Sequence, residues 1–253
     1  MAGSELILRG GVSWAHYRGA GAGTMSFIAV GAALSSPLYY TALQAATMGS
    51  PNIALGLISG GVIVKLLLIL GICAYIAPVP TTRYALKPDG WLIAASAFSL
   101  ALMASEGAWL AWEGLLMLAA LTRYILFVYQ RANERPSLAL LTKPTDCKWC
   151  ATAYICVGIG LIMTGADITI DGTVWIARSF HLSEYGVAAT ITAFATSLPA
   201  LIACLVARQK KQSDALLAIL IYSSLFNILG AAGIIASITV ISIPGAIKPA
   251  FWL

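Results

Sequence analysis

The stretch ATSLPALIACLVARQKKQSDALLAILIYSSLFNI, residues 195–228, decides the fold. A first apolar segment is interrupted at Pro199, and a second one after a short basic turn carries Ser223 and Asn227. Polar residues inside two neighbouring apolar helices are typical of ion sites in membrane transporters, where they replace the water around the ion. Ala200 follows the proline, at a position where such a site needs a carboxylate. The stretch therefore has the outline of an ion site without one of its charges.

The composition predicts an all-α membrane protein. Of its 253 residues, 60% are hydrophobic and only 10% are charged, and the mean hydropathy is +0.88. An average soluble domain has about a quarter of its residues charged. A helix that crosses a bilayer needs roughly 20 apolar residues, and shorter runs can cross as a pair. We count about seven transmembrane helices, at Met25–Met48, Ile53–Ile76, Trp91–Ser105, Gly114–Tyr129, Ala151–Ala177, Tyr185–Val206 and Ala215–Ile238.

The net charge of +5 comes from loops and not from a nucleic-acid-binding face, so no nucleic acid is expected as a partner. If the spans alternate, these basic residues lie on one side: Arg83, Lys87, Arg131, Arg135, Lys143, Lys148, Arg208, Lys210 and Lys211. Such an excess marks the cytoplasmic or matrix-equivalent side. We therefore expect an integral protein, surrounded by membrane lipid, of a bacterial inner membrane or an organellar one (mitochondrial inner membrane or thylakoid).

An internal repeat divides the chain. GSELILRGGVSWA from Gly3 aligns without gaps to GADITIDGTVWIA from Gly165, and the same offset of 162 residues relates Pro37 to Pro199. Equivalent helices are five spans apart, an odd number, so the two copies lie in opposite orientations, as in secondary transporters. The predicted units are a first inverted repeat (1–90), a linking helix pair with a basic loop (91–150) and a second inverted repeat (151–253).

These motifs resemble those of the cation/calcium exchanger superfamily, in particular its short sodium/calcium exchangers. The resemblance rests on ATSLPAL and YSSLFNILG in the second repeat and on LSSPLYY and SGGVIVKLLLILG in the first, and it covers nearly the whole chain. It implies an exchanger-like bundle with two inverted repeats. Laid on the family pattern, the chain is expected to lack most of the first family helix and the last two.

The second repeat keeps most of the ion ligands that the resemblance implies. The family uses a Thr and a Ser before the proline, a Glu after it, and a Ser and an Asn or Asp on the next helix. Thr196, Ser197, Ser223 and Asn227 match this pattern, whereas Ala200 replaces the glutamate.

The first repeat keeps only Ser35 of the same pattern. Leu38 replaces the glutamate, Gly61 replaces the serine, and Lys65 stands where Asn or Asp is expected. Calcium sites use six to eight oxygen ligands, several of them carboxylates. Neither carboxylate is present, so no Ca²⁺ is expected at this degenerate site.

Lys65 lies about 18 Å from the start of its predicted span, at 1.5 Å per residue. A lysine at the centre of a bilayer costs roughly 2.5–3.5 kcal/mol on insertion scales unless it finds partners. Our main hypothesis is that its ammonium replaces the bound ion and ties Ser197, Ser223 or Asn227 to its own helix. Snorkelling towards a polar partner and a functional proton or anion site remain open as alternatives.

The sequence therefore predicts a pseudo-exchanger that does not transport Ca²⁺. We expect it to act as a structural or accessory subunit, because the missing helices would leave apolar faces for other subunits of a membrane complex or for lipid. The alternative is an active transporter with altered specificity, moving Na⁺ and H⁺ or an anion by means of Lys65. No catalytic motif is present, so neither an enzyme nor a cofactor is expected.

Two further features have simpler interpretations. Cys147 and Cys150 form a single CxxC motif, which is half a zinc site or a redox pair, and cysteines beside a helix are commonly incidental. The chain has only two histidines to complete a metal site, so none is predicted there. Asp167 and Asp171 are interpreted as loop and cap residues.

Overall fold

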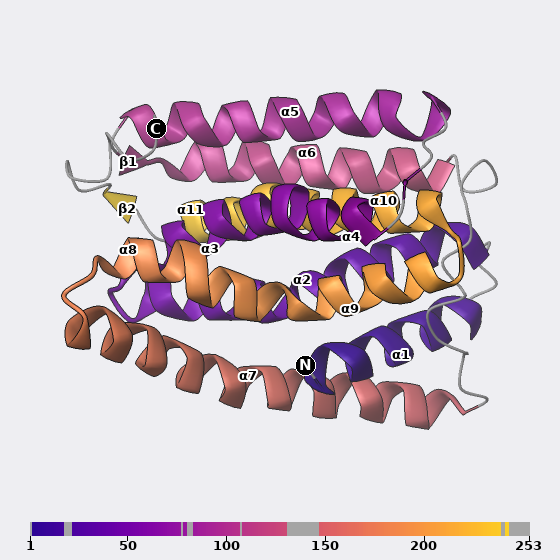
Figure 1. Cartoon of the computed structure of the whole chain (residues 1–253), viewed down its shortest axis with the longest axis horizontal. Coiled ribbons are helices and arrows are strands. Elements are labelled where there is room, and N and C mark those ends of the chain that lie inside the picture. The colour runs from indigo at the N-terminus through magenta and orange to yellow at the C-terminus, as the bar shows by residue number, and fades with distance from the viewer. Residues whose placement is uncertain are drawn as a thin grey trace.

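The computed structural model describes residues 2–17, 22–76, 78–79, 83–106, 108–130, 147–238 and 241–242. Almost all of these residues are helical, and the helices run nearly parallel or antiparallel to one another (Figure 1). Each predicted apolar run coincides closely with a helix or with a continuous helical segment. The prediction of an all-α membrane bundle is confirmed.

The elements follow one another in this order: α1 (Ala2–Tyr17), α2 (Ala22–Thr47), α3 (Pro51–Ile63), η1 (Val64–Ile69), α4 (Leu70–Ile76), α5 (Arg83–Glu106), β1 (Ala108–Trp109), α6 (Ala111–Gln130), α7 (Lys148–Ser179), α8 (Glu184–Val187), η3 (Ala188–Thr192), α9 (Ala193–Gln209), α10 (Ser213–Leu225), η4 (Phe226–Ala232), α11 (Gly233–Ile238) and β2 (Ile241–Ser242). The segments η1, η3 and η4 are π-helical turns inside longer helices. The two short strands pair antiparallel, with Trp109 opposite Ile241.

Among the described residues, five helical segments are long and apolar enough to cross a membrane: Pro51–Ile76, Ala111–Gln130, Lys148–Ser179, Glu184–Gln209 and Ser213–Ile238. Helix α5 contributes a shorter apolar stretch, Asp89–Leu102. Only helices that satisfy their own backbone hydrogen bonds, and closed barrels, are stable in lipid. That the remaining predicted runs also cross stays a prediction.

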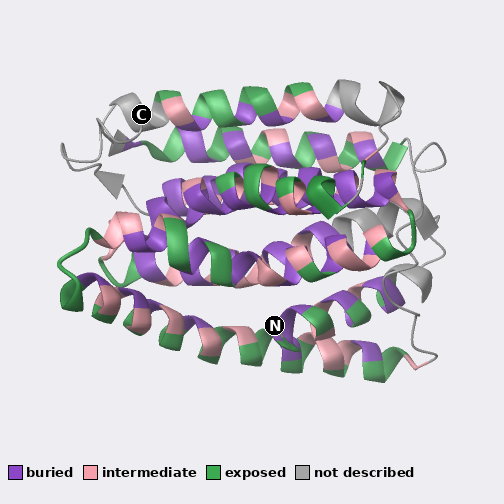
Figure 2. Ribbon diagram, viewed as in Figure 1, coloured by how far each residue is buried: buried purple, intermediate pink, exposed green. Residues whose placement is uncertain are grey.

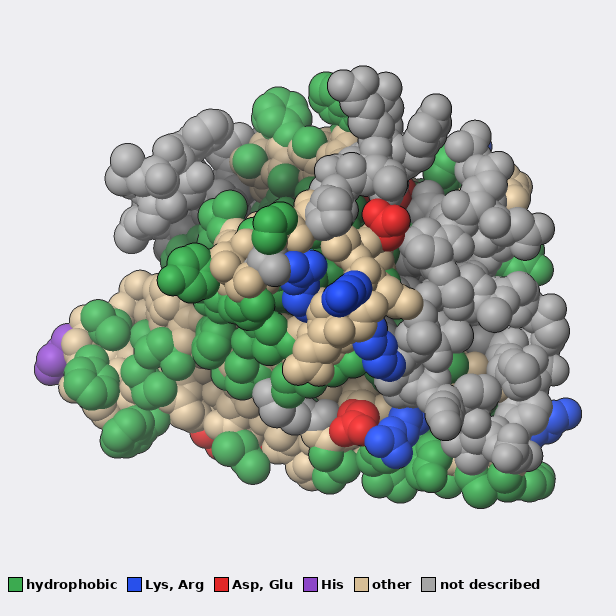
Figure 3. Space-filling model, turned by 45° about the vertical axis from the view of Figure 1, so that its right-hand side comes forward, with side chains coloured by type: hydrophobic (Ala, Val, Ile, Leu, Met, Phe, Trp, Pro, Cys, Tyr) green, Lys and Arg blue, Asp and Glu red, His purple; other side chains and the backbone are tan. Residues whose placement is uncertain are grey.

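The bundle has a buried centre and apolar outer helices. Helices α5 and α6 form one side, α1 and α7 form the opposite side, and α2, α3, α9 and α10 lie between them (Figure 1). Buried residues concentrate in the middle helices, and exposed ones lie on the outer faces (Figure 2). Large apolar side chains such as Trp91, Leu115 and Ile168 are exposed. Figure 3 shows apolar side chains on part of one face and a group of Lys and Arg side chains near the middle of that view. The apolar parts of such a surface suit lipid.

Small residues allow the closest helix contacts, as is common in membrane bundles. A Cβ atom at Gly60 would come within 2.1 Å of the Ala189 carbonyl oxygen, so only glycine fits there. Helix α1 packs antiparallel on α7 in the same way: a Cβ at Gly3 would lie 2.7 Å from the Gly158 oxygen, and one at Gly158 would lie 2.7 Å from the Gly3 oxygen. Gly60 is therefore a packing residue between α3 and η3.

Two of the three described π-helical turns, η1 and η4, follow the predicted repeat. The turn η1 begins at Val64 and η4 begins at Phe226, which are 162 residues apart. This is the offset that relates Pro37 to Pro199, and both prolines lie inside helices. The correspondence favours two related halves, which remain a prediction.

One interpretation of the sequence is wrong. Asp167 and Asp171 are not loop or cap residues, because α7 continues to Ser179. Asp167 accepts a hydrogen bond from Gln44 Nε2 on α2. The carboxylate therefore ties two helices together. Three residues of the predicted basic loop, Arg131, Arg135 and Lys143, lie outside the described residues.

Candidate functional site: a buried lysine at the ion position

The nine residues of the degenerate ion site lie in the middle helices. They come from α2 and the α3–η1 segment in the first half of the chain and from α9 and the α10–η4 segment in the second. All nine are buried: Ser35, Leu38, Gly61, Lys65, Thr196, Ser197, Ala200, Ser223 and Asn227. Lys65 is fully buried, at 0% exposure, so snorkelling of its ammonium to the surface does not occur in this structure.

The ammonium of Lys65 contacts the second half of the chain. Lys65 Nζ donates a hydrogen bond to the Ser223 carbonyl oxygen at 3.2 Å. With the Asn227 amide oriented so that both of its ends are satisfied, Oδ1 accepts from Lys65 Nζ at 2.7 Å. In the same orientation Nδ2 donates to Ser35 Oγ at 3.2 Å. Hydrogen bonds to a charged donor are about twice as strong as neutral ones. The ammonium is thus held as a cation would be.

The Ser223 carbonyl oxygen is the centre of this network. It also accepts from Ser35 Oγ at 2.9 Å and from Asn227 Nδ2 at 3.3 Å. The helix changes from α to π hydrogen bonding shortly after Ser223, at Phe226. In a π turn, each backbone N–H bonds to the carbonyl five residues back and not four, so the regular pairing of carbonyls is disturbed at the junction. Such turns are frequent at functional sites. The local backbone therefore presents an acceptor to side chains.

Where the resemblance places a glutamate and a serine, the first repeat has a packed apolar pair. A Cβ atom at Gly61 would lie 2.3 Å from Leu38 Cδ1, so the leucine occupies the space of any side chain at position 61. Ala200, at the other glutamate position, is also fully buried. Apolar packing replaces both lost carboxylates.

Thr196 and Ser197 stay outside the network. Thr196 Oγ1 bonds back to its own helix, to the carbonyls of Thr192 at 3.0 Å and Ala193 at 3.1 Å. Among the residues that the structure describes, the buried hydroxyls of Ser197 and Ser224 find no hydrogen-bond partner. Of the three partners suggested for Lys65, Ser223 and Asn227 contact it and Ser197 does not.

A second polar cluster was missed by sequence reasoning. Asp89 on α5 is buried, and its carboxylate accepts from Tyr124 Oη at 2.9 Å and from Tyr222 Oη at 3.4 Å. The two tyrosine rings stack, with centroids 5.8 Å apart. Tyr222 is the residue before Ser223, so α10 carries both clusters. An acidic residue at the start of an apolar run was the available signal.

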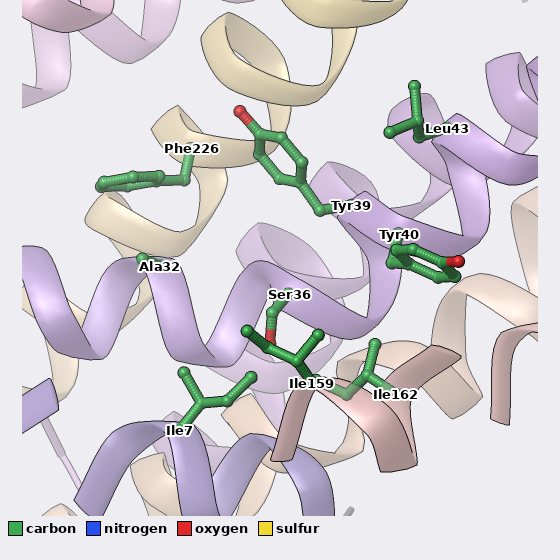
Figure 4. Close-up of a pocket in the computed structure, with 9 residues that line it drawn as sticks. All are labelled: Ile7, Ala32, Ser36, Tyr39, Tyr40, Leu43, Ile159, Ile162 and Phe226. Carbon is green, nitrogen blue, oxygen red and sulfur yellow. The ribbon is translucent and has the colours of Figure 1, made fainter. Parts of the chain in front are cut away.

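An apolar pocket of about 300 Å³ lies beside the site (Figure 4). Residues of α1, α2, α7 and η4 line it: Ile7, Ala32, Ser36, Tyr39, Tyr40, Leu43, Ile159, Ile162 and Phe226. Ser36 Oγ is occupied by a hydrogen bond to the Ala33 carbonyl. No carboxylate is among the lining residues, so this pocket offers no polar path for a cation.

The CxxC motif lies far along the chain from this site, at the start of α7. Cys147 is the residue before the helix, and its Sγ accepts from the Cys150 backbone N–H at 3.4 Å. Within the described part of the chain, no group of three His, Cys, Asp or Glu side chains could hold a metal ion.

Comparison with known proteins identifies the family of this fold. The profile of the sodium/calcium exchanger protein family matches residues 1–130 and 150–251, so the chain belongs to this family. The resemblance seen in the motifs is confirmed. Because the family consists of exchangers, the prediction that the chain is not an enzyme is favoured.

Two named relatives match most of the chain. The putative antiporter CaxA of Alkalimonas amylolytica is 29% identical over 217 residues, which is 83% of this chain and 67% of that protein. Inner membrane protein YrbG of Escherichia coli strain K12 is 26% identical over 235 residues, 89% of this chain and 70% of that protein. A solved structure of the sodium-calcium exchanger NCX_Mj, soaked with Na⁺ and Sr²⁺, has a TM-score of 0.67 at 20% identity. The match covers 99% of this chain and 82% of the chain of that structure, which shows that the two share a fold.

Proposed function

We propose that this chain is a non-transporting member of the sodium/calcium exchanger family, in which the ammonium of Lys65 takes the place of the transported cation. One observation carries the proposal: Nζ is fully buried and donates to the Ser223 carbonyl and to Asn227 Oδ1. These oxygens come from the opposite half of the chain, so the lysine bridges the two halves. A bound Na⁺ or Ca²⁺ would have to displace a covalently attached positive charge.

Electrostatics supports this reading. Two unit charges 4 Å apart repel by about 4 kcal/mol at an effective dielectric constant of 20. Among the described residues, the salt bridge Arg9–Glu5 lies at the surface and does not involve Lys65. The hydrogen bonds of Lys65 are all with neutral groups. No carboxylate offsets the ammonium there, so a second cation is disfavoured. A structural role in a larger membrane assembly, in a bacterial inner membrane or an organellar one, is the function that we infer.

Ion binding gives the first test. A ligand that binds only the native state stabilises it by about 2.7 kcal/mol at 100 times its Kd. We expect the melting temperature of the purified protein to be the same with and without millimolar Ca²⁺ or Na⁺. Reconstituted vesicles should take up no more Ca²⁺ than protein-free vesicles under a Na⁺ or a pH gradient, while an active exchanger reconstituted in parallel should. Ca²⁺ uptake driven by either gradient would contradict the proposal.

The alternative of altered specificity has a separate outcome. Movement of Na⁺, protons or an anion that Lys65→Met abolishes would establish an active transporter that uses the lysine. For the structural role, the protein is extracted from its native membrane in mild detergent, run on a native gel and analysed by mass spectrometry. Stoichiometric migration with a larger complex is expected. Migration alone near 26.5 kDa, or as a small homo-oligomer, would overturn the subunit role but not the loss of transport.

A further inference from the structure

The first turn of α7 holds two thiols close together. Cys147 has an extended backbone, with φ −122° and ψ 120°, and its Sγ accepts from the Cys150 backbone N–H. Residues three apart at the start of a helix lie on the same face. The two sulfur atoms therefore share one face of the turn, and neither is in a disulfide.

The pair is accessible from water. Cys147 is half-buried and Cys150 is exposed, in contrast to Cys73 and Cys204, which are buried. Between them lie the exposed Lys148 and Trp149, the latter 84% exposed. Lysine and tryptophan are characteristic of the boundary between membrane and water. The long apolar run of α7 begins only at Ala151, so the thiols lie at that boundary.

The environment of Cys147 favours reaction through its sulfur. A helix N-terminus carries a partial positive charge, which stabilises a thiolate. The hydrogen bond from the Cys150 side chain, together with that from the Cys150 backbone, lowers the pKa of the Cys147 thiol. A zinc site needs four ligands, and the described residues supply no third one nearby.

We propose that Cys147 and Cys150 form a redox-active dithiol that closes to a disulfide by exchange with a low-molecular-weight disulfide such as oxidised glutathione. The Cys147 thiolate attacks one sulfur of the glutathione disulfide and expels one glutathione thiolate. The Cys150 thiol then loses its proton, and the resulting thiolate attacks the Cys147 sulfur of the mixed disulfide and expels the second glutathione thiolate. The protein loses two electrons and two protons, and one oxidised glutathione becomes two reduced ones.

The site lies where α1 packs on α7. A Cβ at Gly10 would come within 2.6 Å of the Ala151 carbonyl oxygen, and Trp14 Nε1 donates to Thr152 Oγ1 at 3.1 Å. The disulfide would fix the turn immediately before these contacts. The pair thus lies directly beside the junction between the two helices.

The test uses the whole chain, reduced, purified in detergent and equilibrated with glutathione buffers of increasing oxidised fraction. Thiols are quenched with acid and alkylated, and the chain is cleaved before aspartates, which gives one peptide, 146–166, with both cysteines. We expect that peptide to lose two alkylation sites and two hydrogen atoms. Persistent alkylation of both cysteines in fully oxidised glutathione would overturn the proposal.

Variants separate the two roles. Cys150→Ser should stop at a mixed disulfide between Cys147 and glutathione, formed at nearly the original rate. Cys147→Ser should react more slowly, on the order of ten-fold, because Cys150 lacks the same activation. Cys156→Ser, in the same peptide, should leave the disulfide unchanged. Glutathione adducts on both cysteines without a disulfide, or protection of both by Zn²⁺ alone, would also contradict the proposal.

Discussion

Leu38 lies so close to Gly61 that one added methyl group would approach its Cδ1 atom to 2.3 Å. Both residues are buried, and they come from different helices of the first half, α2 and α3. The exchanger resemblance places a carboxylate and a hydroxyl at these two positions. The pair shows that apolar packing fills the space between these two positions.

Gly61→Ala should therefore destabilise the protein by about 1–3 kcal/mol, the usual cost of overpacking a core. The change would be measured as a lower melting temperature in detergent. Adding Leu38→Ala should recover part of the loss, because it removes the atom that clashes.

Gly71→Ala is the matched control for this pair, since a Cβ there meets nothing within 4 Å. It should be neutral or slightly stabilising, because alanine favours a helix over glycine by up to about 1 kcal/mol. Equal losses at Gly61 and Gly71 would show that the contact with Leu38 is not the cause.

The bond between Lys65 and Asn227 should appear as a coupling energy. Removing one partner of a buried hydrogen bond costs roughly 1–3 kcal/mol, and more for a charged group, because the other partner is left unsatisfied. Lys65→Met and Asn227→Leu should each lower the melting temperature. The double variant should lose clearly less than the sum of the two. Strict additivity would mean that the two side chains do not interact, and Lys210→Met, at an exposed turn residue, provides a control.

Asp89 depends on its two tyrosines. Tyr124→Phe removes the donor 2.9 Å from Oδ1, and a buried polar group left with fewer partners costs about 1–3 kcal/mol. Tyr222→Phe removes the longer contact of 3.4 Å and should cost less. Thermal unfolding of both variants in detergent gives the comparison. A larger loss of stability in the Tyr222 variant would indicate that the substitution acts through the neighbouring Ser223 and not through the hydrogen bond to Asp89.

The sidedness of the bundle can be read from single cysteines. The start of α7 and the turn between α9 and α10, which carries Lys210 and Lys211, lie at the same end in Figure 1, and the α7–α8 turn lies at the other. If the basic end faces the cytoplasm, a membrane-impermeant maleimide should label Cys150 in inside-out vesicles and not in intact cells. His181→Cys, in a cysteine-free background, should show the opposite pattern. Labelling of both from one side would exclude this topology.

The fold was predictable because lipid is a demanding solvent: a segment such as Ile53–Ile76 must be helical wherever its backbone meets hydrocarbon. The meeting of Lys65 with Asn227 followed from the repeat, which places both at equivalent depths. The remaining details depend on the backbone. Lys65 reaches the carbonyl of Ser223 and not its hydroxyl. A π turn, such as the one that begins at Phe226, cannot be recognised from the types of side chain in the sequence. Asp89 was overlooked because its tyrosine partners are distant in sequence.

Because the ammonium is covalently attached to the chain, its occupancy of the site does not depend on the concentration of any ion in solution. A free ion leaves its site when its concentration falls, and 100 mV of membrane potential acts on it with up to about 2.3 kcal/mol per charge. The Lys65 ammonium is joined by its own side chain to η1, so its effective concentration beside Asn227 is set by geometry alone. No change of salt in either compartment can dilute it, and no voltage can carry it away. On the proposed function, the middle of this bundle is therefore occupied by a charge that belongs to the chain itself and that no ion gradient supplies.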